Sequence, residues 1–255
     1  VNLLFLLALV AAYYAVAREL FGVNKGLALL AAVAIGYTPV LYDLTHSCYV
    51  ETFFTLLVLM SFAHYLGHLR ESDTAKPWLL CMAFAGLACA TKYLGLFYFA
   101  FFSAAGFFTV SNRKLYYAGL GLGLVLLSPW YVKNWVLLGN PVYPLLNPLF
   151  GSPYLSPERS LQFNRLLTNY HDGRGVIDYL LLPLKLVVGY NPPPAVGRLA
   201  FGGKLSAFLL LPLLGLGFRN GRERLVSVLF VLSAIFWAWS SQQVRFLLPP
   251  MAIGS

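Results

Sequence analysis

Charge is the scarcest feature of this sequence. Only 11% of its 255 residues are charged, 59% are hydrophobic, and the mean hydropathy is +0.72. A soluble globular domain carries about 25% charged residues, and a soluble core of this length would leave too much apolar surface in water. The composition therefore argues against a soluble protein and predicts a chain that lipid covers over much of its surface.

The chain also lacks the spacings of common cysteine and histidine sites. Its three cysteines, Cys48, Cys81 and Cys89, show no CxxC spacing, so neither a zinc site nor a disulfide framework is predicted. His64 and His68 form an HxxxH spacing with no carboxylate between them, which does not favour a metal site. No metal ligand is assigned, and a divalent cation as cofactor stays open.

Two further motifs are absent. An apolar run starts at Val1, but no basic segment precedes it and no small-residue cleavage site follows, so we do not predict a signal peptide here. The last residues open another apolar stretch, and the chain is expected to be a fragment of a longer protein. Gly119, Gly121 and Gly123 follow no strand, so they form no dinucleotide loop, and close helix packing is favoured instead.

The sequence is rich in long apolar stretches. A membrane-spanning helix needs about 20 apolar residues, and several of the stretches are shorter, so tilt or buried packing must help. We predict an all-α fold, a polytopic transmembrane bundle of about eight to nine spans forming a single domain over residues 1–255. The apolar stretches lie at roughly 2–17, 26–42, 50–67, 78–91, 94–110, 115–132, 205–218 and 225–240.

The stretch 78–110 decides the topology. One helix of that length would run about 50 Å at 1.5 Å per residue, too long for a hydrocarbon core of about 30 Å, and Lys92 interrupts it. With a hairpin at Lys92, one side of the membrane collects most basic loop residues and is predicted to be cytoplasmic. These residues are Arg18, Lys25, Arg70, Lys76, Arg113, Lys114, Arg219, Arg222 and Arg224. They also explain the net charge of +9 without a nucleic-acid partner.

A long connection over residues 133–204 breaks the pattern of spans. It contains GNPVYP, FGSPYLSPERS, YHDGRG and NPPP, whose composition indicates an ordered loop with short helices. A loop this long is usually functional. Its segment VIDYLLLPLKLVVGY is apolar but short, and we expect it to lie at the extracytoplasmic membrane surface or to be re-entrant.

Two carboxylates are placed on the extracytoplasmic side by this topology. Asp43 and Glu51 flank the start of a predicted span, in YDLTHSCYVE. A carboxylate there can act as a general base, bind a cation or orient a sugar hydroxyl. The alternative for Glu51 is a place in a first helical turn, where the helix dipole favours it by about 0.3–1 kcal/mol. Asp43 could equally cap a turn.

Basic and polar residues share that side. Lys92, in GLACATK, suits a lipid phosphate at headgroup depth, although a snorkelling lysine is the alternative. Arg245, in SSQQVRFLLPP, suits a phosphate or carboxylate, or a plain position at a helix start. Tyr143 and its neighbouring tryptophans are more often interfacial anchors than sugar platforms. Further candidates for substrate contact are His46, Lys133, Tyr143, His171 and Gln243.

Four segments carry a resemblance to a known family: DLTHSCYVETFFTLLVLM, GLACATK, RFLLP and WYVKNWVLLGNPVYP. They resemble the membrane glycosyltransferases of the GT-C superfamily, and most closely the bacterial branch near protein O-mannosyltransferases and the aminoarabinose transferase of lipid A. The likeness covers nearly the whole chain. It implies transfer of a sugar from a polyprenyl-phosphate donor to an acceptor at the extracytoplasmic face, in a bacterial or archaeal cytoplasmic membrane.

The resemblance also implies residue roles. Lys92 and Arg245 match the family's basic elements, and Glu51 matches its second acidic position, with Asp43 nearby. The family's principal acid follows its first helix and is expected to precede Val1, so the fragment itself is expected to be inactive. Three alternatives stay open: a transporter or flippase of lipid-linked sugars, a polysaccharide polymerase or ligase of related fold, and a non-catalytic assembly subunit.

Overall fold

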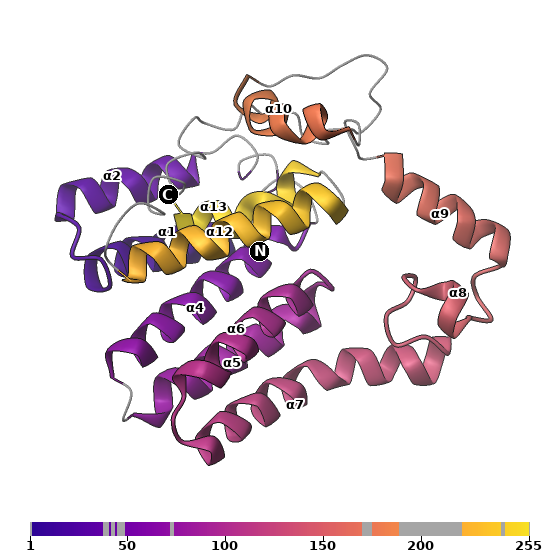
Figure 1. The fold of residues 1–255 in the computed structure, drawn as a ribbon, viewed down its shortest axis with the longest axis horizontal. Helices are drawn as coiled ribbons and strands as arrows, with labels where there is room; N and C mark the ends of the chain where they lie inside the picture. Colours follow the sequence, from indigo (N-terminus) through magenta and orange to yellow (C-terminus); the bar gives the residue numbers. More distant parts are fainter. Residues whose placement is uncertain are drawn as a thin grey trace. The chain divides into compact units, whose positions relative to one another are not determined.

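A computed structural model describes most of the chain, and its described part is helical, with no strand (Figure 1). The predicted all-α class is thus confirmed for this part. The residues described are 2–37, 41, 44, 49–71, 74–169, 175–188, 221–240 and 243–254. The predicted span 205–218 lies outside them.

Seven described helices are apolar, and three of them are long and apolar enough to cross a membrane. The three are α1 (Asn2–Glu19), α4 (Glu51–Arg70) and α7 (Arg113–Leu138). The shorter ones are α2 (Lys25–Gly36), α5 (Ala75–Thr91), α6 (Gly95–Thr109) and the segment Arg224–Ser240 of α12 (Gly221–Ser240). Each coincides with an apolar stretch of the sequence.

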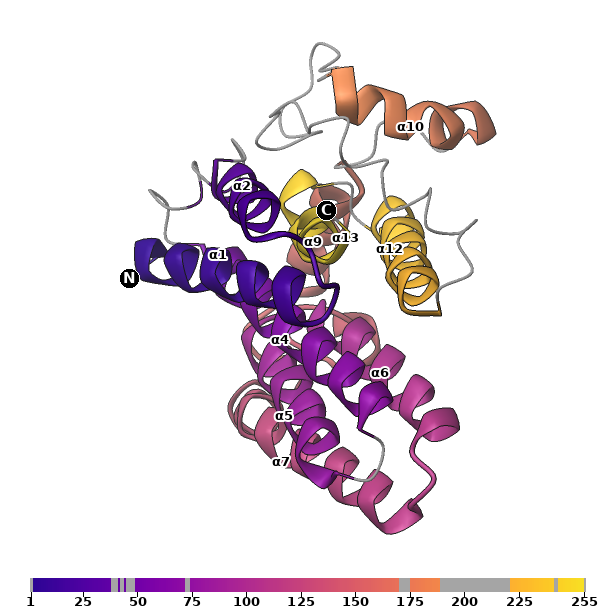
Figure 2. The same ribbon diagram turned by 90° about the vertical axis from the view of Figure 1, so that its left-hand side faces the viewer.

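The chain divides into two compact units, and α4 contributes to both. One unit comprises Val1–Leu56 and Leu167–Ser255, and the other comprises Leu57–Leu166. In the first, α1 packs on α2, and α12 packs on the 3₁₀ helix η3 (Val244–Leu247) and on α13 (Leu248–Gly254) (Figure 2). In the second, α5 packs on both α6 and α7.

The hairpin predicted at Lys92 is confirmed. Helix α5 ends at Thr91, Lys92 has an extended backbone, and α6 begins at Gly95. The backbone N–H of Gly95 donates to the carbonyl of Lys92, 2.8 Å away, which closes the turn. A Cβ atom at Gly95 would overlap the backbone of Ala88, so the turn is too tight for any other residue. Lys92 therefore stands at a rigid corner.

Close packing of α5 on α7 depends on glycine. A Cβ atom at Gly86 would overlap the backbone of Gly123, and one at Gly123 would lie 2.8 Å from the carbonyl oxygen of Met82. Gly119, one turn before Gly123, lies against the indole of Trp78. Close packing was predicted for three glycines of α7, and it is confirmed for Gly119 and Gly123, whereas Gly121 faces open space.

Helix α7 continues through a proline. Pro129 has no N–H to donate to the carbonyl of Val125, four residues earlier. The hydroxyl of Ser128 donates to that carbonyl instead, at 2.9 Å. Such substitution of a side-chain donor is how proline is tolerated in apolar helices, and it lets α7 reach Leu138.

The predicted loop region 133–204 begins inside α7 and carries further helices where it is described. After a left-handed cap at Gly139, the buried side chain of Asn140 bonds the carbonyl of Leu145 and the N–H of Val142, which fixes the loop. Three helices follow: α8 (Asn147–Phe150), α9 (Pro157–Asn169) and α10 (Val176–Val188). The expectation of short helices in this region is confirmed.

Candidate functional site

Glu51 is the first residue of α4, and its side chain is almost entirely buried. The residue is 3% exposed, and it is the acidic residue of the first turn. The N–H groups of a first turn have no partner within the helix, and together with the helix dipole they stabilise a negative charge there. The alternative given for Glu51, a place in a first helical turn, is therefore confirmed.

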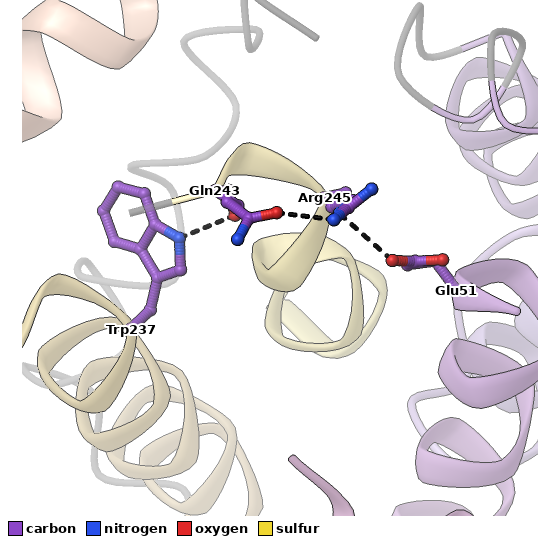
Figure 3. Close-up of polar contacts among 4 residues, drawn as sticks. All are labelled: Glu51, Trp237, Gln243 and Arg245. Atoms are coloured by element: carbon purple, nitrogen blue, oxygen red, sulfur yellow. Dashed lines mark hydrogen bonds and ion pairs between the residues drawn. The ribbon is translucent and has the colours of Figure 1, made fainter. Parts of the chain in front are cut away.

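Arg245 meets this carboxylate. It lies on η3, and its Nε is 3.2 Å from Oε1 of Glu51 (Figure 3). The side chains are 16% and 4% exposed, respectively. The contact is an ion pair, not an aligned hydrogen bond. Two residues that the sequence places at opposite ends of the chain, and that we predicted as site residues, are thus brought together.

Gln243 holds the guanidinium in place. Nη2 of Arg245 donates to Oε1 of Gln243 at 2.6 Å, and the indole Nε1 of Trp237 donates to the backbone carbonyl of Gln243 at 2.8 Å (Figure 3). Trp237 and Gln243 are both 3% exposed. A continuous polar chain thus runs from α12 through η3 to α4, in the order Trp237, Gln243, Arg245 and Glu51. It includes Gln243, a predicted contact residue.

An aromatic ring completes the site. The guanidinium carbon of Arg245 lies 4.5 Å from the ring centroid of Tyr49, two residues before Glu51. A guanidinium over a ring is stabilised by about 0.5–1 kcal/mol when exposed and more when desolvated. Sequence reasoning missed Tyr49 and Trp237, because the chain is rich in aromatic residues and nothing in the sequence distinguishes the rings that contact Arg245 and Gln243 from the others.

The pair combines two charges that a functional site could use. Placing two charges in a poorly hydrated interior costs several kcal/mol per ion before their attraction offsets it. Such arrangements are therefore weak sources of stability and frequent components of functional sites. Arginine also carries five N–H donors in a planar fork, which suits it to phosphate as well as carboxylate.

Lys92 belongs to the second unit, where a polar network holds its turn. The hydroxyl of Tyr93 donates to the backbone carbonyl of Tyr143 at 2.6 Å and accepts from the side-chain amide of Asn134 at 2.9 Å. Burial raises the pKa of Tyr93, while hydrogen bonds from Trp130 and Asn134 act in the opposite direction. The hydroxyl thus stays protonated at neutral pH and keeps the corner at Lys92 attached to the loop after α7.

The other candidates are distributed as follows. Tyr143 takes part in this network through its backbone carbonyl. Lys133 lies with its Nζ 3.8 Å above the ring of Trp130, so its charge is engaged on the surface of α7. Asp43, His46 and His171 lie outside the described residues.

No metal site is present in the described part of the chain, where no three histidine, cysteine or acidic side chains lie close enough to hold an ion. His64 stacks on Phe84 with ring centroids 5.5 Å apart, and His68 lies 6.0 Å from the ring of Trp78. Both members of the HxxxH spacing are therefore packed among aromatic rings.

Comparison with protein families gives a match over nearly the whole chain. Residues 1–252 match the model of a family described as a domain of unknown function, DUF8201. No curated protein and no solved structure is detectably similar to the chain.

Proposed function

The chain belongs to the DUF8201 family, and we propose that it is a multi-pass membrane glycosyltransferase. The proposed reaction transfers a sugar from a polyprenyl-phosphate donor to an acceptor at the extracytoplasmic face. The observation that supports it most is the buried contact of Glu51 with Arg245, since both residues match functional positions of the GT-C pattern.

The chemistry needs both charges. In the transfer, the bond between the anomeric carbon and a phosphate oxygen breaks, and its electron pair stays on the phosphate. A fixed guanidinium in a poorly hydrated site stabilises that developing charge better than water does. The acceptor hydroxyl forms the new bond to the anomeric carbon and loses its proton. The carboxylate of Glu51 is suited to accept that proton or to orient the hydroxyl.

Lys92, in the second unit, is proposed as a further residue that binds lipid phosphate. Its place at a rigid corner between two apolar helices suits an ammonium at headgroup depth. The network of Tyr93 with Tyr143 and Asn134 limits the movement of that corner.

The proposed membrane arrangement has about eight to nine spans, with the arginine-rich loops in the cytoplasm of a bacterium or archaeon. Three described helices are long and apolar enough to cross a membrane, and the proposal assigns the four shorter apolar helices to further spans. Helix α10 has 13 residues and carries Asp178 and Lys185, so it is not assigned to a span. Its exposed apolar residues Ile177, Leu180, Leu181 and Leu184 recur at helical spacing. This stripe suits a helix lying in the membrane surface.

The test is a transfer assay on the full-length protein in vesicles, with polyprenyl-phosphate sugars as donors. Arg245→Met is expected to lower the rate about 100- to 1,000-fold, as loss of one charge-stabilising donor does. Glu51→Gln is expected to lower it by about 100-fold or more, and Lys92→Met is also expected to lower it. Lys114→Met, at the exposed start of α7, is the control for loss of a positive charge.

The outcomes separate the alternatives. Unchanged transfer in both the Arg245 and the Lys92 variants would refute the proposed role in phosphate binding. Movement of the labelled lipid across the vesicle membrane without any sugar transfer would favour the flippase instead.

A further inference from the structure

Two threonine hydroxyls beside Glu51 have no hydrogen-bond partner among the residues that the structure describes. Thr52 and Thr55 are each 1% exposed, and the Oγ1 atom of each is buried without a donor or acceptor in reach. Threonine in a helix ordinarily bonds the carbonyl four residues earlier, as Thr91 and Thr109 do here, at 2.9 Å and 3.1 Å. Thr52 and Thr55 therefore differ from Thr91 and Thr109.

The two hydroxyls share a helix face with the carboxylate. Residues 51, 52 and 55 fall within about 100° of one another around a helix of 3.6 residues per turn. Side chains on a helix lean toward its N-terminus. Thr55 thus leans over the turn that holds Glu51, and Thr52 leans toward the open end of α4. All three residues are buried, so they form a polar patch at the start of α4, next to Arg245.

A buried hydroxyl without a partner is unfavourable, and native proteins rarely keep one without a reason. Valine has nearly the shape of threonine and would fill both positions without that penalty. Two such residues one turn apart, beside a buried ion pair, indicate that a polar ligand supplies the missing hydrogen bonds.

We propose that Thr52 and Thr55 bind hydroxyl groups of the donor's sugar ring, while Arg245 binds the adjoining phosphate. The proposal rests on the proposed glycosyltransferase function. A threonine hydroxyl both donates and accepts, which matches the hydroxyls of a sugar. The neighbouring carboxylate of Glu51 accepts hydrogen bonds from a sugar and repels a phosphate, so the neutral part of the donor fits this patch.

The test compares two ligands on the full-length protein: polyprenyl phosphate alone, and the same lipid carrying mannose or aminoarabinose. Affinities and melting temperatures are measured for the wild type and for Thr52→Val/Thr55→Val. The wild type is expected to bind one of the sugar-bearing lipids more tightly than the bare phosphate. The double variant is expected to lose about tenfold or more of that preference, the value of two hydrogen bonds, while its affinity for polyprenyl phosphate is unchanged.

Three controls make the result specific. Thr52→Ser/Thr55→Ser keeps both hydroxyls and is expected to keep the preference. Ser233→Ala removes another buried hydroxyl without a partner, in α12, and is expected to have no effect on either ligand. The unliganded melting temperature of the valine variant is expected to equal or exceed that of the wild type; if the double variant does not fold, the two single valine variants replace it.

Each outcome is decisive. If the valine variant keeps the full preference, or if the wild type binds both lipids equally, the sugar-binding role is refuted and the glycosyltransferase function stands. If the wild type binds neither lipid, both proposals are refuted.

Discussion

The ion pair of Glu51 and Arg245 allows a prediction with a definite size. Removing one partner of a buried pair lowers the free energy of unfolding by about 3–5 kcal/mol, because the other charge stays buried. The carboxylate is the more deeply buried partner, 4% exposed against 16%. Arg245→Met is therefore expected near the upper end of this range. Glu51→Gln is expected near the lower end, since the guanidinium keeps Gln243 and the ring of Tyr49.

The double variant tests the cause. Glu51→Gln/Arg245→Met leaves no buried charge at the site, so its cost is expected to fall short of the summed single costs by about 2–3 kcal/mol. The measurement is reversible unfolding of the purified protein in mixed micelles with increasing denaturing detergent. Lys185→Met is the matched control, because its pair with Asp178 is longer, 3.6 Å, and more exposed. It is expected to cost less than about 1 kcal/mol.

The reasoning would be refuted if the double variant lost as much free energy of unfolding as the two single variants lose together. It would equally be refuted if Arg245→Met were no more harmful than Lys185→Met. Either result would mean that the carboxylate is hydrated well enough to need no cation, and the site would then be an ordinary wet surface.

Three further predictions concern the second unit. Gly123→Ala is expected to destabilise the protein by about 1–3 kcal/mol through overpacking, whereas Gly121→Ala, which meets open space, is expected to be neutral or slightly stabilising; thermal unfolding measures both. Tyr93→Phe is expected to cost about 1–3 kcal/mol and to speed amide exchange in the loop after α7, observed by mass spectrometry. Ser128→Ala is expected to leave the carbonyl of Val125 without its hydroxyl donor and to raise amide exchange in that turn alone.

Local features of the fold were readable from the sequence. The turn at Lys92 was predicted because a single helix over residues 78–110 would be longer than a bilayer is thick. The charge of Lys92 also interrupts this apolar stretch. The contact surface of α7 followed from glycines one turn apart. The place of Glu51 in a first turn followed from an acidic residue directly before an apolar run. Each of these inferences uses neighbours in sequence only.

The site itself required distant contacts. No pattern near Arg245 specifies that its partner is Glu51, because any nearby buried carboxylate would satisfy the same physics. Tyr93 was missed for a related reason. Its hydroxyl bonds a backbone carbonyl and an amide far along the chain, and a tyrosine beside a membrane boundary ordinarily needs no such partner.

The Ser128–Pro129 step in α7 has a consequence for how this family can vary. The hydroxyl of Ser128 is needed only because Pro129 has no N–H to donate to the carbonyl of Val125. Relatives that replace Pro129 are thus released from any requirement at position 128. Relatives that retain the proline and carry alanine at 128 must supply another donor to carbonyl 125 or bend the helix there. Substitutions at the two positions should accordingly occur in one order, the proline first and the serine after it.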